Sequence, residues 1–272
     1  MRRFFRAVFA QVRDGRAQRM KGVSMTTKQK KLVAAAAAFA LCFGIVPQAY
    51  AMHIMEGSLP VGYCVAWGVL CLPFLLAGFF SIRKTLDTNR RALTLLAMSG
   101  AFVFVISSLK LPSVSGSCSH MTGTGLGAIL FGPAAVSVLG LIVLIFQALL
   151  LGHGGLTTLG ANTFSMAIAG PFVAYGLFVL LRKMKVNRKV GVFFAAFLGD
   201  LFTYCVTAFQ LALSHKSATT FGAALKEYLV VFAGTQLPLA VVEGILTVVI
   251  LIGLETYAKP ELKAVGFIRE GR

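Results

Sequence analysis

Apolar residues occur in long runs along most of this chain, and polar residues fill the short stretches between them. Six of these runs are close to the roughly 20 residues that a helix needs to cross the hydrocarbon core of a membrane. The pattern therefore predicts an all-α integral membrane protein. The runs cover Val61–Phe80, Ala92–Leu109, Leu126–Leu151, Phe164–Leu181, Gly191–Leu213 and Leu229–Leu254.

The third run changes the number of helices that we expect. Basic loops of membrane proteins stay in the cytoplasm, and a single third crossing would place the basic loop 182–189 on the other side. The stretch Thr122–Leu151 has 30 residues, about 45 Å as a helix, and a Gly-Pro pair at 132–133 interrupts it. We therefore predict a short helix, Thr122–Phe131, followed by Pro133–Leu151. About seven transmembrane helices, the third short, then keep the main basic clusters and the C-terminus inside.

The start of the chain has the features of a secretory signal. Residues 25–51 combine three lysines, an apolar stretch from Leu32 to Val46 and the small-x-small sequence Ala-Tyr-Ala at 49–51. Cleavage after Ala51 would make Met52 the mature N-terminus, whereas a retained first transmembrane helix is the alternative. We interpret residues 1–24 as an over-extended translation start. The expected domains are thus 1–24 extension, 25–51 signal peptide and 52–272 membrane domain.

Composition and charge exclude several classes of protein. The chain is 57% hydrophobic and 13% charged, with a mean hydropathy of +0.83, which disfavours a soluble enzyme, a disordered chain and a disulfide scaffold. The formal charge of +17 alone would suggest nucleic-acid binding, but ten of the 26 basic residues lie in the first 31 positions. The chain has no G-x-x-x-x-G-K-[ST] sequence. Energy for uphill transport would therefore come from a partner or an ion gradient.

A histidine at the second mature position is the most informative chemical feature. After cleavage, the α-amine of Met52, the amide nitrogen of His53 and its imidazole can close two fused chelate rings around one metal. Such a nitrogen site suits Ni(II), Cu(II) and low-spin Co(II). By the predicted topology, His120 lies on the same outer side and supplies a fourth nitrogen. A loop histidine that only forms hydrogen bonds is the alternative for His120.

Several residues near these histidines are candidates for supporting roles. Cys118 is either a thiolate ligand or a packed thiol, and Glu56 is either an acceptor for an imidazole N–H or an exposed loop carboxylate. Ser117 and Ser119 belong to a segment whose hydroxyls can satisfy open backbone amides. His153, in a second glycine-rich stretch at 152–162, either orients the site or caps a helix.

Two carboxylates lie inside apolar runs, where a charge is costly. Asp200 and Glu243 therefore mark either function or a buried hydrogen-bonded partner. Packing roles and substrate roles are equally compatible with the sequence.

The segments Met52–Gly57 and Pro112–His120 closely resemble the CbiM family, the substrate-capture subunits of cobalt energy-coupling-factor (ECF) transporters. NikM is the nickel relative. The resemblance implies a seven-helix subunit that holds a metal near the outer face through Met52, His53 and His120. It also implies three partners: a small membrane subunit (CbiN), a transmembrane coupling protein (CbiQ) and an ATPase (CbiO). Met121 departs from the family, which usually has proline there.

The leading hypothesis is a non-catalytic subunit of an ABC-type transporter that imports Co²⁺ for cobalamin biosynthesis. We expect a multi-pass protein of the cell (inner) membrane, with its mature N-terminus outside and its C-terminus in the cytoplasm. The ion is then transported and is not a resident cofactor. A nickel-specific subunit is the alternative within the family. An intramembrane metalloenzyme is the alternative of another class, although the chain has no H-E-x-x-H and no G-x-S-x-G sequence.

Overall fold

The computed structural model describes residues 53–112, 118–214 and 220–268, and it confirms the all-α class. Helices dominate this part of the chain, and β1 and β2 form a single antiparallel two-residue pair. Each of the seven predicted segments corresponds to a helical region. The main helices are α3 (Val61–Thr88), α4 (Ala92–Ser108), α5 (Thr124–Phe131), α6 (Pro133–Leu151), α8 (Gly170–Lys183), α9 (Arg188–Ser214) and α10 (Phe221–Tyr257). The shorter elements are β1 (Leu111–Pro112), β2 (Cys118–Ser119), α7 (Leu159–Asn162), the π-helix η2 (Thr163–Ala169) and α11 (Lys259–Ala264).

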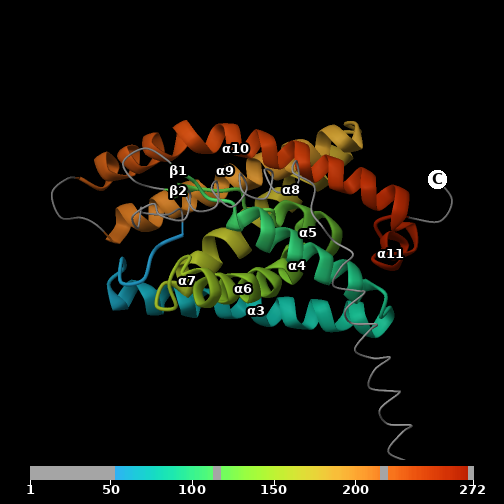
Figure 1. The fold of residues 1–272 in the computed structure, drawn as a ribbon, viewed down its shortest axis with the longest axis horizontal. Coiled ribbons are helices and arrows are strands. Elements are labelled where there is room, and N and C mark those ends of the chain that lie inside the picture. The colour runs from blue at the N-terminus through green and yellow to red at the C-terminus, as the bar shows by residue number, and fades with distance from the viewer. Residues whose placement is uncertain (1–52, 113–117, 215–219, 269–272) are drawn as a thin grey trace, which may run out of the picture. The chain divides into compact units, whose positions relative to one another are not determined.

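The long helices run roughly along one direction, with α9 and α10 on one side and α3 and α6 on the other (Figure 1). Five helical stretches of the described residues are long and apolar enough to cross a membrane: α3, α6, the continuous stretch 159–183, α9 and α10. Helix α3 buries only Cys71 and Gly78 among its 28 residues. Eight of its large apolar side chains are exposed, as expected of a helix that contacts lipid: Val61, Val65, Val69, Leu70, Leu72, Leu76, Phe79 and Phe80.

The short third helix is enclosed by the other helices. Helix α5 has eight residues, about 12 Å of helix, and every residue from Thr124 to Leu130 is buried. A Cβ at Gly125 would lie 3.0 Å from the Cα of Ala196, so glycine allows α5 to approach α9 closely. The helix ends at Gly132, which has a φ of +84°, and Pro133 begins α6. The predicted break is confirmed, and α5 is shielded from lipid.

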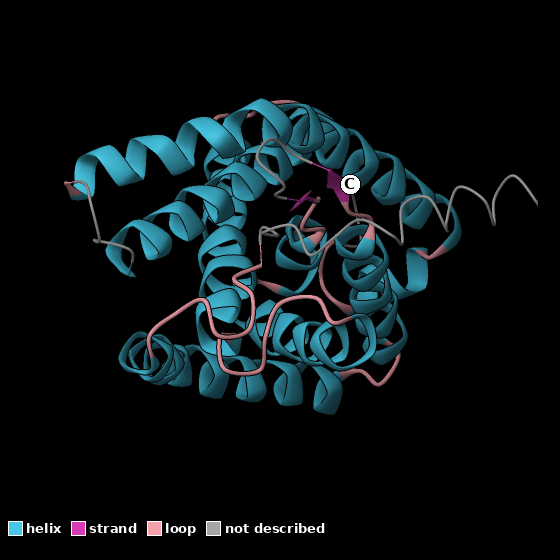
Figure 2. Cartoon of the chain, turned by 60° about the vertical axis from the view of Figure 1, so that its left-hand side comes forward, coloured by secondary structure: helices cyan, strands magenta, loops and turns pink. Residues whose placement is uncertain are grey.

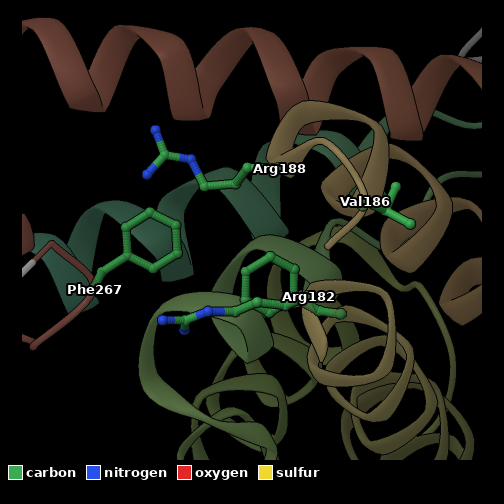
Figure 3. Close-up of a pocket in the computed structure, with 6 residues that line it drawn as sticks. Arg182, Val186, Arg188 and Phe267 are labelled. Carbon is green, nitrogen blue, oxygen red and sulfur yellow. The ribbon is translucent and has the colours of Figure 1, made fainter. Parts of the chain in front are cut away.

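The basic clusters gather at one end of the helices. Arg83 and Lys84 lie at the end of α3, and the basic turn 182–189 joins α8 to α9. A cavity of about 170 Å³ lies at this turn, with Arg182, Arg188 and Phe267 in its lining (Figure 3). The guanidinium of Arg188 pairs with Glu255 at 2.7 Å and lies 5.8 Å from the centre of the Phe267 ring. These contacts tie the segment after α11 to the turn between α8 and α9.

The opposite end holds the segments that sequence analysis singled out for chemistry. The residues before α3, the loop after α6 and the end of α9 meet there, and β1 and β2 lie close by among the helices (Figure 2). His53 and His120 are therefore on the same side of the fold, as the charge pattern predicted.

Candidate metal centre

The backbone next to His53 is held by side chains from α7 and the residue before it. The amide of Ile54 donates to Asn162 Oδ1 at 2.8 Å, and the carbonyl of Ile54 accepts from Asn162 Nδ2 at 3.0 Å. The hydroxyl of Thr158 donates to the same carbonyl at 2.6 Å. Asn162 thus replaces the partner strand that an extended segment would otherwise need. His53 is 2% exposed, so this extended segment enters the interior of the protein.

Glycines in the 152–162 stretch allow this close approach. A Cβ at Gly155 would lie 2.6 Å from the Cα of Glu56, which no real side chain tolerates. Gly154 has a φ of +82°, a conformation that favours glycine. The glycine pattern in the sequence is therefore explained by backbone packing around His53.

A chain of hydrogen bonds determines which nitrogen of His53 carries the proton. The hydroxyl of Ser107 donates to the Val103 carbonyl at 2.5 Å, so its oxygen accepts from Gln147 Nε2 at 2.7 Å. The amide oxygen of Gln147 then lies 3.2 Å from Nε2 of His53. Because an amide oxygen only accepts, the hydrogen is on Nε2. The other ring nitrogen, Nδ1, keeps its lone pair.

The same reasoning applies to His120. Its Nδ1 lies 2.9 Å from the carbonyl oxygen of Met121, which also only accepts, so Nε2 keeps the lone pair. Burial lowers the pKa of His53 well below its ordinary value and that of His120 to about 4. Both rings are consequently neutral at pH 7.

The two lone pairs face one another. His53 Nδ1 and His120 Nε2 are 3.0 Å apart, and with the hydrogens placed as above neither nitrogen has a proton to donate to the other. Two neighbouring imidazole ligands of one metal, each bound at about 2.0–2.1 Å, would have nitrogens about 2.9 Å apart. The pair therefore has the spacing and the protonation state that a shared cation requires.

The segment around His120 is anchored to α9 and α10. The carbonyl of His120 accepts hydrogen bonds from the Tyr204 hydroxyl and from Gln236 Nε2. Gln236 Nε2 also donates to Asp200, which fixes the position of the amide. Asp200 therefore acts on His120 through Gln236.

Glu243 holds the residues that follow His120. Its carboxylate accepts from the amide of Thr122 at 2.6 Å, the hydroxyl of Thr122 at 3.0 Å and the amide of Gly123 at 3.0 Å. These groups precede the first turn of α5, which has no side-chain cap of its own. A carboxylate at this place satisfies open amides and is favourable at the positive end of a helix dipole. Asp200 and Glu243, whose roles the sequence left open, both position the His120 segment.

His153 completes a cluster of three buried histidines. Its ring centre is 4.4 Å from that of His53 and 5.0 Å from that of His120. One ligand atom from each histidine can be chosen so that all three lie within 4.8 Å of one another. Burial lowers the pKa of His153 below its ordinary value, so this ring is neutral as well.

The other predicted site residues have varied positions. Met52 and Ser117 lie outside the described residues, and Cys118 is described only through its backbone, which pairs with Pro112 in the β1–β2 ladder. Ser119 is buried, with its hydroxyl 2.7 Å from that of Thr235. The carboxylate of Glu56 accepts from the amide of Thr157 at 3.1 Å, while Gln147 takes the imidazole N–H of His53.

Sequence reasoning missed four polar residues that hold the two histidines. Three of them lie inside apolar helical runs, where an amide or a phenol needs a partner, and this rule could have found them. The fourth, Asn162, ends the glycine-rich stretch 152–162. They are Gln147, Asn162, Tyr204 and Gln236.

Comparisons with known proteins all indicate the same family. The family model CbiM, described as "cobalt uptake substrate-specific transmembrane region", matches residues 53–262. A cobalt transport protein CbiM from Lachnoclostridium phytofermentans is 67% identical over 248 residues, which cover 91% of this chain and 99% of that protein. A cobalt transport protein CbiM from Ruminiclostridium cellulolyticum is 53% identical over 92% of this chain and all of that protein.

A solved structure has a similar fold. The crystal structure of a truncated transition metal transporter matches with a TM-score of 0.67 and 28% sequence identity, and the match covers 75% of this chain and 99% of that one.

Proposed function

Because this chain belongs to the CbiM family, we propose that it is the substrate-capture membrane subunit of a transporter that imports Co²⁺. The observation that carries the proposal is the pair of neutral imidazoles whose lone pairs converge 3.0 Å apart. Both rings are buried, and each is held by a hydrogen bond on its outer nitrogen. Imidazole nitrogens of this kind suit a transition metal ion as substrate and not Mg²⁺ or Ca²⁺.

The remaining ligands come from the mature N-terminus. We propose that cleavage after Ala51 frees the α-amine of Met52. This amine, in its neutral form, and the amide nitrogen of His53, which releases its proton to solvent, then join His53 Nδ1 and His120 Nε2 around the ion. The arrangement of His53 supports this, because Nδ1 is the ring nitrogen that closes a chelate ring with the amide of the same residue. On this proposal residues 1–24 are not part of the functional protein and 25–51 are its signal peptide.

Release of the ion requires the ligands to separate. The His53 segment is held from α6 and α7 and the His120 segment from α9 and α10, so a shift between these helices would pull the two nitrogens apart. In our proposal the shift is driven by a separate ATPase of the CbiO type, through a coupling protein of the CbiQ type, with a small CbiN-like subunit. The chain itself catalyses no reaction and supplies cobalt for cobalamin biosynthesis.

The proposed orientation places the metal centre at the outer end of the helices that cross the cell (inner) membrane, and the basic clusters at their cytoplasmic end. The centre and the clusters lie at opposite ends of the helices, which fits the positive-inside rule. The C-terminus would then be cytoplasmic.

Metal analysis of the purified protein tests the proposal. The wild type should retain Co²⁺ through purification, and His53→Ala should lose it because the substitution removes the central chelating residue. His215→Ala, in a segment outside the described residues, is the matched control with the same change of side chain. If His53→Ala retains as much metal as the wild type, the proposal is wrong. Mass spectrometry of the mature N-terminus shows whether Met52 is the first residue.

A further inference from the structure

His153 is buried with both ring nitrogens unused. The side chain is 1% exposed, and neither nitrogen has a hydrogen-bond partner among the described residues. His53 and His120 differ in this respect, because each forms one hydrogen bond away from the cluster and directs the other nitrogen inward. Leaving buried polar atoms without partners is costly, and the large majority of buried side-chain polar atoms have one. Both nitrogens of His153 are therefore available to bind a ligand.

Backbone conformation directs this ring into the cluster. Helix α6 ends at Gly152, which has a φ of +55°, and the amide of His153 donates to the Gln147 carbonyl at 3.1 Å. Gly154 follows with a φ of +82°, where a Cβ would lie 3.3 Å from Cδ2 of His53. The two glycines turn the chain so that His153 lies beside both other imidazoles. Its nitrogens are not needed to hold this position and are free to bind an ion.

The dimensions of the cluster match one ion. Chosen ligand atoms of the three histidines lie within 4.8 Å of one another. Nitrogens on opposite sides of an ion bound at about 2.0–2.1 Å would be about 4.2 Å apart. Small side-chain movements are enough to bring all three nitrogens to one centre.

We infer that His153 is a direct nitrogen ligand of the transported ion, and that it favours Co²⁺ over Ni²⁺. This inference rests on the proposed function. The amine, the amide, His53 and His120 alone would form a tetragonal site of four nitrogens, a geometry that suits Ni(II) and Cu(II). A third imidazole adds a fifth nitrogen. Planar Ni(II) gains little from such an axial ligand, whereas Co(II) readily accepts five ligands.

The test compares His153→Phe, which keeps an aromatic ring without nitrogen, with His153→Ala and with the control His215→Ala. All are purified as the full mature chain and titrated with Co²⁺ and Ni²⁺. X-ray absorption of the Co²⁺-loaded protein counts the bound imidazoles. We expect one imidazole fewer in both His153 variants and a loss of Co²⁺ affinity of about tenfold to a hundredfold or more. The loss of Ni²⁺ affinity should be smaller, and added imidazole should restore the Co²⁺ spectrum of His153→Ala.

Two results would overturn the inference: an unchanged imidazole count in both variants, as expected if His153 only binds water, or equal losses of affinity for the two ions. Failure here is distinguishable from failure of the proposed function. If His53→Ala retains metal, the proposed function fails. If His53→Ala loses metal and the His153 variants show the same imidazole count as the wild type, only this inference fails.

Discussion

The two histidines that face one another are held by different kinds of chemistry. The His53 segment depends on neutral amides and hydroxyls, mainly Asn162 and Gln147. The His120 segment depends on Glu243 and, through Gln236, on Asp200. The Glu243 carboxyl group alone accepts three hydrogen bonds from Thr122 and Gly123, and a hydrogen bond contributes about 0.5–1.5 kcal/mol, or about 1.5–3 kcal/mol where one partner is charged. The difference indicates that the His120 segment is the more firmly held half of the centre.

The strongest test of this comparison removes one half at a time. We expect His120→Ala and His53→Ala each to lose high-affinity Co²⁺ binding entirely, because two converging lone pairs are needed for one ion. The double variant should bind no worse than either single variant, since the residues act as a unit. Isothermal titration with Co²⁺ measures this. Additive losses would show that the two histidines bind ions independently.

Glu243→Gln should give the next largest effect. The substitution replaces one carboxylate oxygen, which accepts hydrogen bonds from Thr122 and Gly123, by an NH₂ group. This NH₂ group is itself a donor and cannot accept from the two backbone amides. We expect a loss of stability of about 2–3 kcal/mol and weaker Co²⁺ binding. Thermal unfolding in detergent and metal titration measure the two effects. The matched control is Glu255→Gln in the same helix, where the ion pair with Arg188 is partly exposed, and it should leave metal binding unchanged.

Asn162→Ala should destabilise the protein less. It leaves the amide of Ile54 without its partner, while the carbonyl of Ile54 still accepts from Thr158. The expected cost is about 1–2 kcal/mol, and Asn187→Ala, a turn residue at the opposite end, is the control. If Asn162→Ala costs more than Glu243→Gln in the same unfolding measurement, the assignment of the firmer half is reversed.

The pH dependence of binding separates the histidines from the N-terminal amine. Burial lowers the pKa of His53 and His120 below the ordinary value of about 6.5, so protons compete little at these rings between about pH 8 and pH 6. An α-amine has a pKa of about 7.7–8.0. If Met52 supplies a ligand, Co²⁺ affinity should already fall between pH 8 and pH 6. A chain whose N-terminal amine is acetylated should bind more weakly, with a flatter profile over this range.

A further expected effect is on the stability of the metal-free protein. Because the folded-state pKa of His120 lies below its unfolded value, the unfolded chain takes up more protons as the pH falls. The contribution of a neutral His120 is therefore complete above about pH 6.5 and is lost progressively from there down to about pH 4. Unfolding measured at pH 7 and at pH 5 should show this loss in the wild type and a smaller one in His120→Ala.

The sequence predicted the parts of this molecule that depend on local pattern and on charge. The length of each apolar run defined the helices, and the Gly-Pro pair at 132–133 separated α5 from α6. Helix α10 begins at Phe221, earlier than the predicted Leu229, because its first turns include Lys226 and Glu227 and are not apolar enough to be recognised. Charge placement was enough to bring His53 and His120 to one side.

The contacts inside the centre could not be predicted in this way. Gln147 and His53 are 94 positions apart, and their contact depends on how α6 is rotated against the segment before α3. Glu56 illustrates the same limit: it is near His53 in sequence, but its carboxylate accepts from Thr157. The direction of the His153 side chain depends on the conformations of Gly152 and Gly154, which the glycine pattern does not specify.

The shortness of α5 has an electrical consequence. Its eight residues account for about 12 Å, less than half of the roughly 30 Å of hydrocarbon, so the His120 segment that precedes it continues inward from the outer surface. In the proposed orientation, an ion bound there has already crossed part of the transmembrane voltage. A full crossing is worth about 2.3 kcal/mol per elementary charge at 100 mV. A divalent cation entering a cell with a negative interior would therefore be drawn toward this position by the membrane potential before any ATP is hydrolysed.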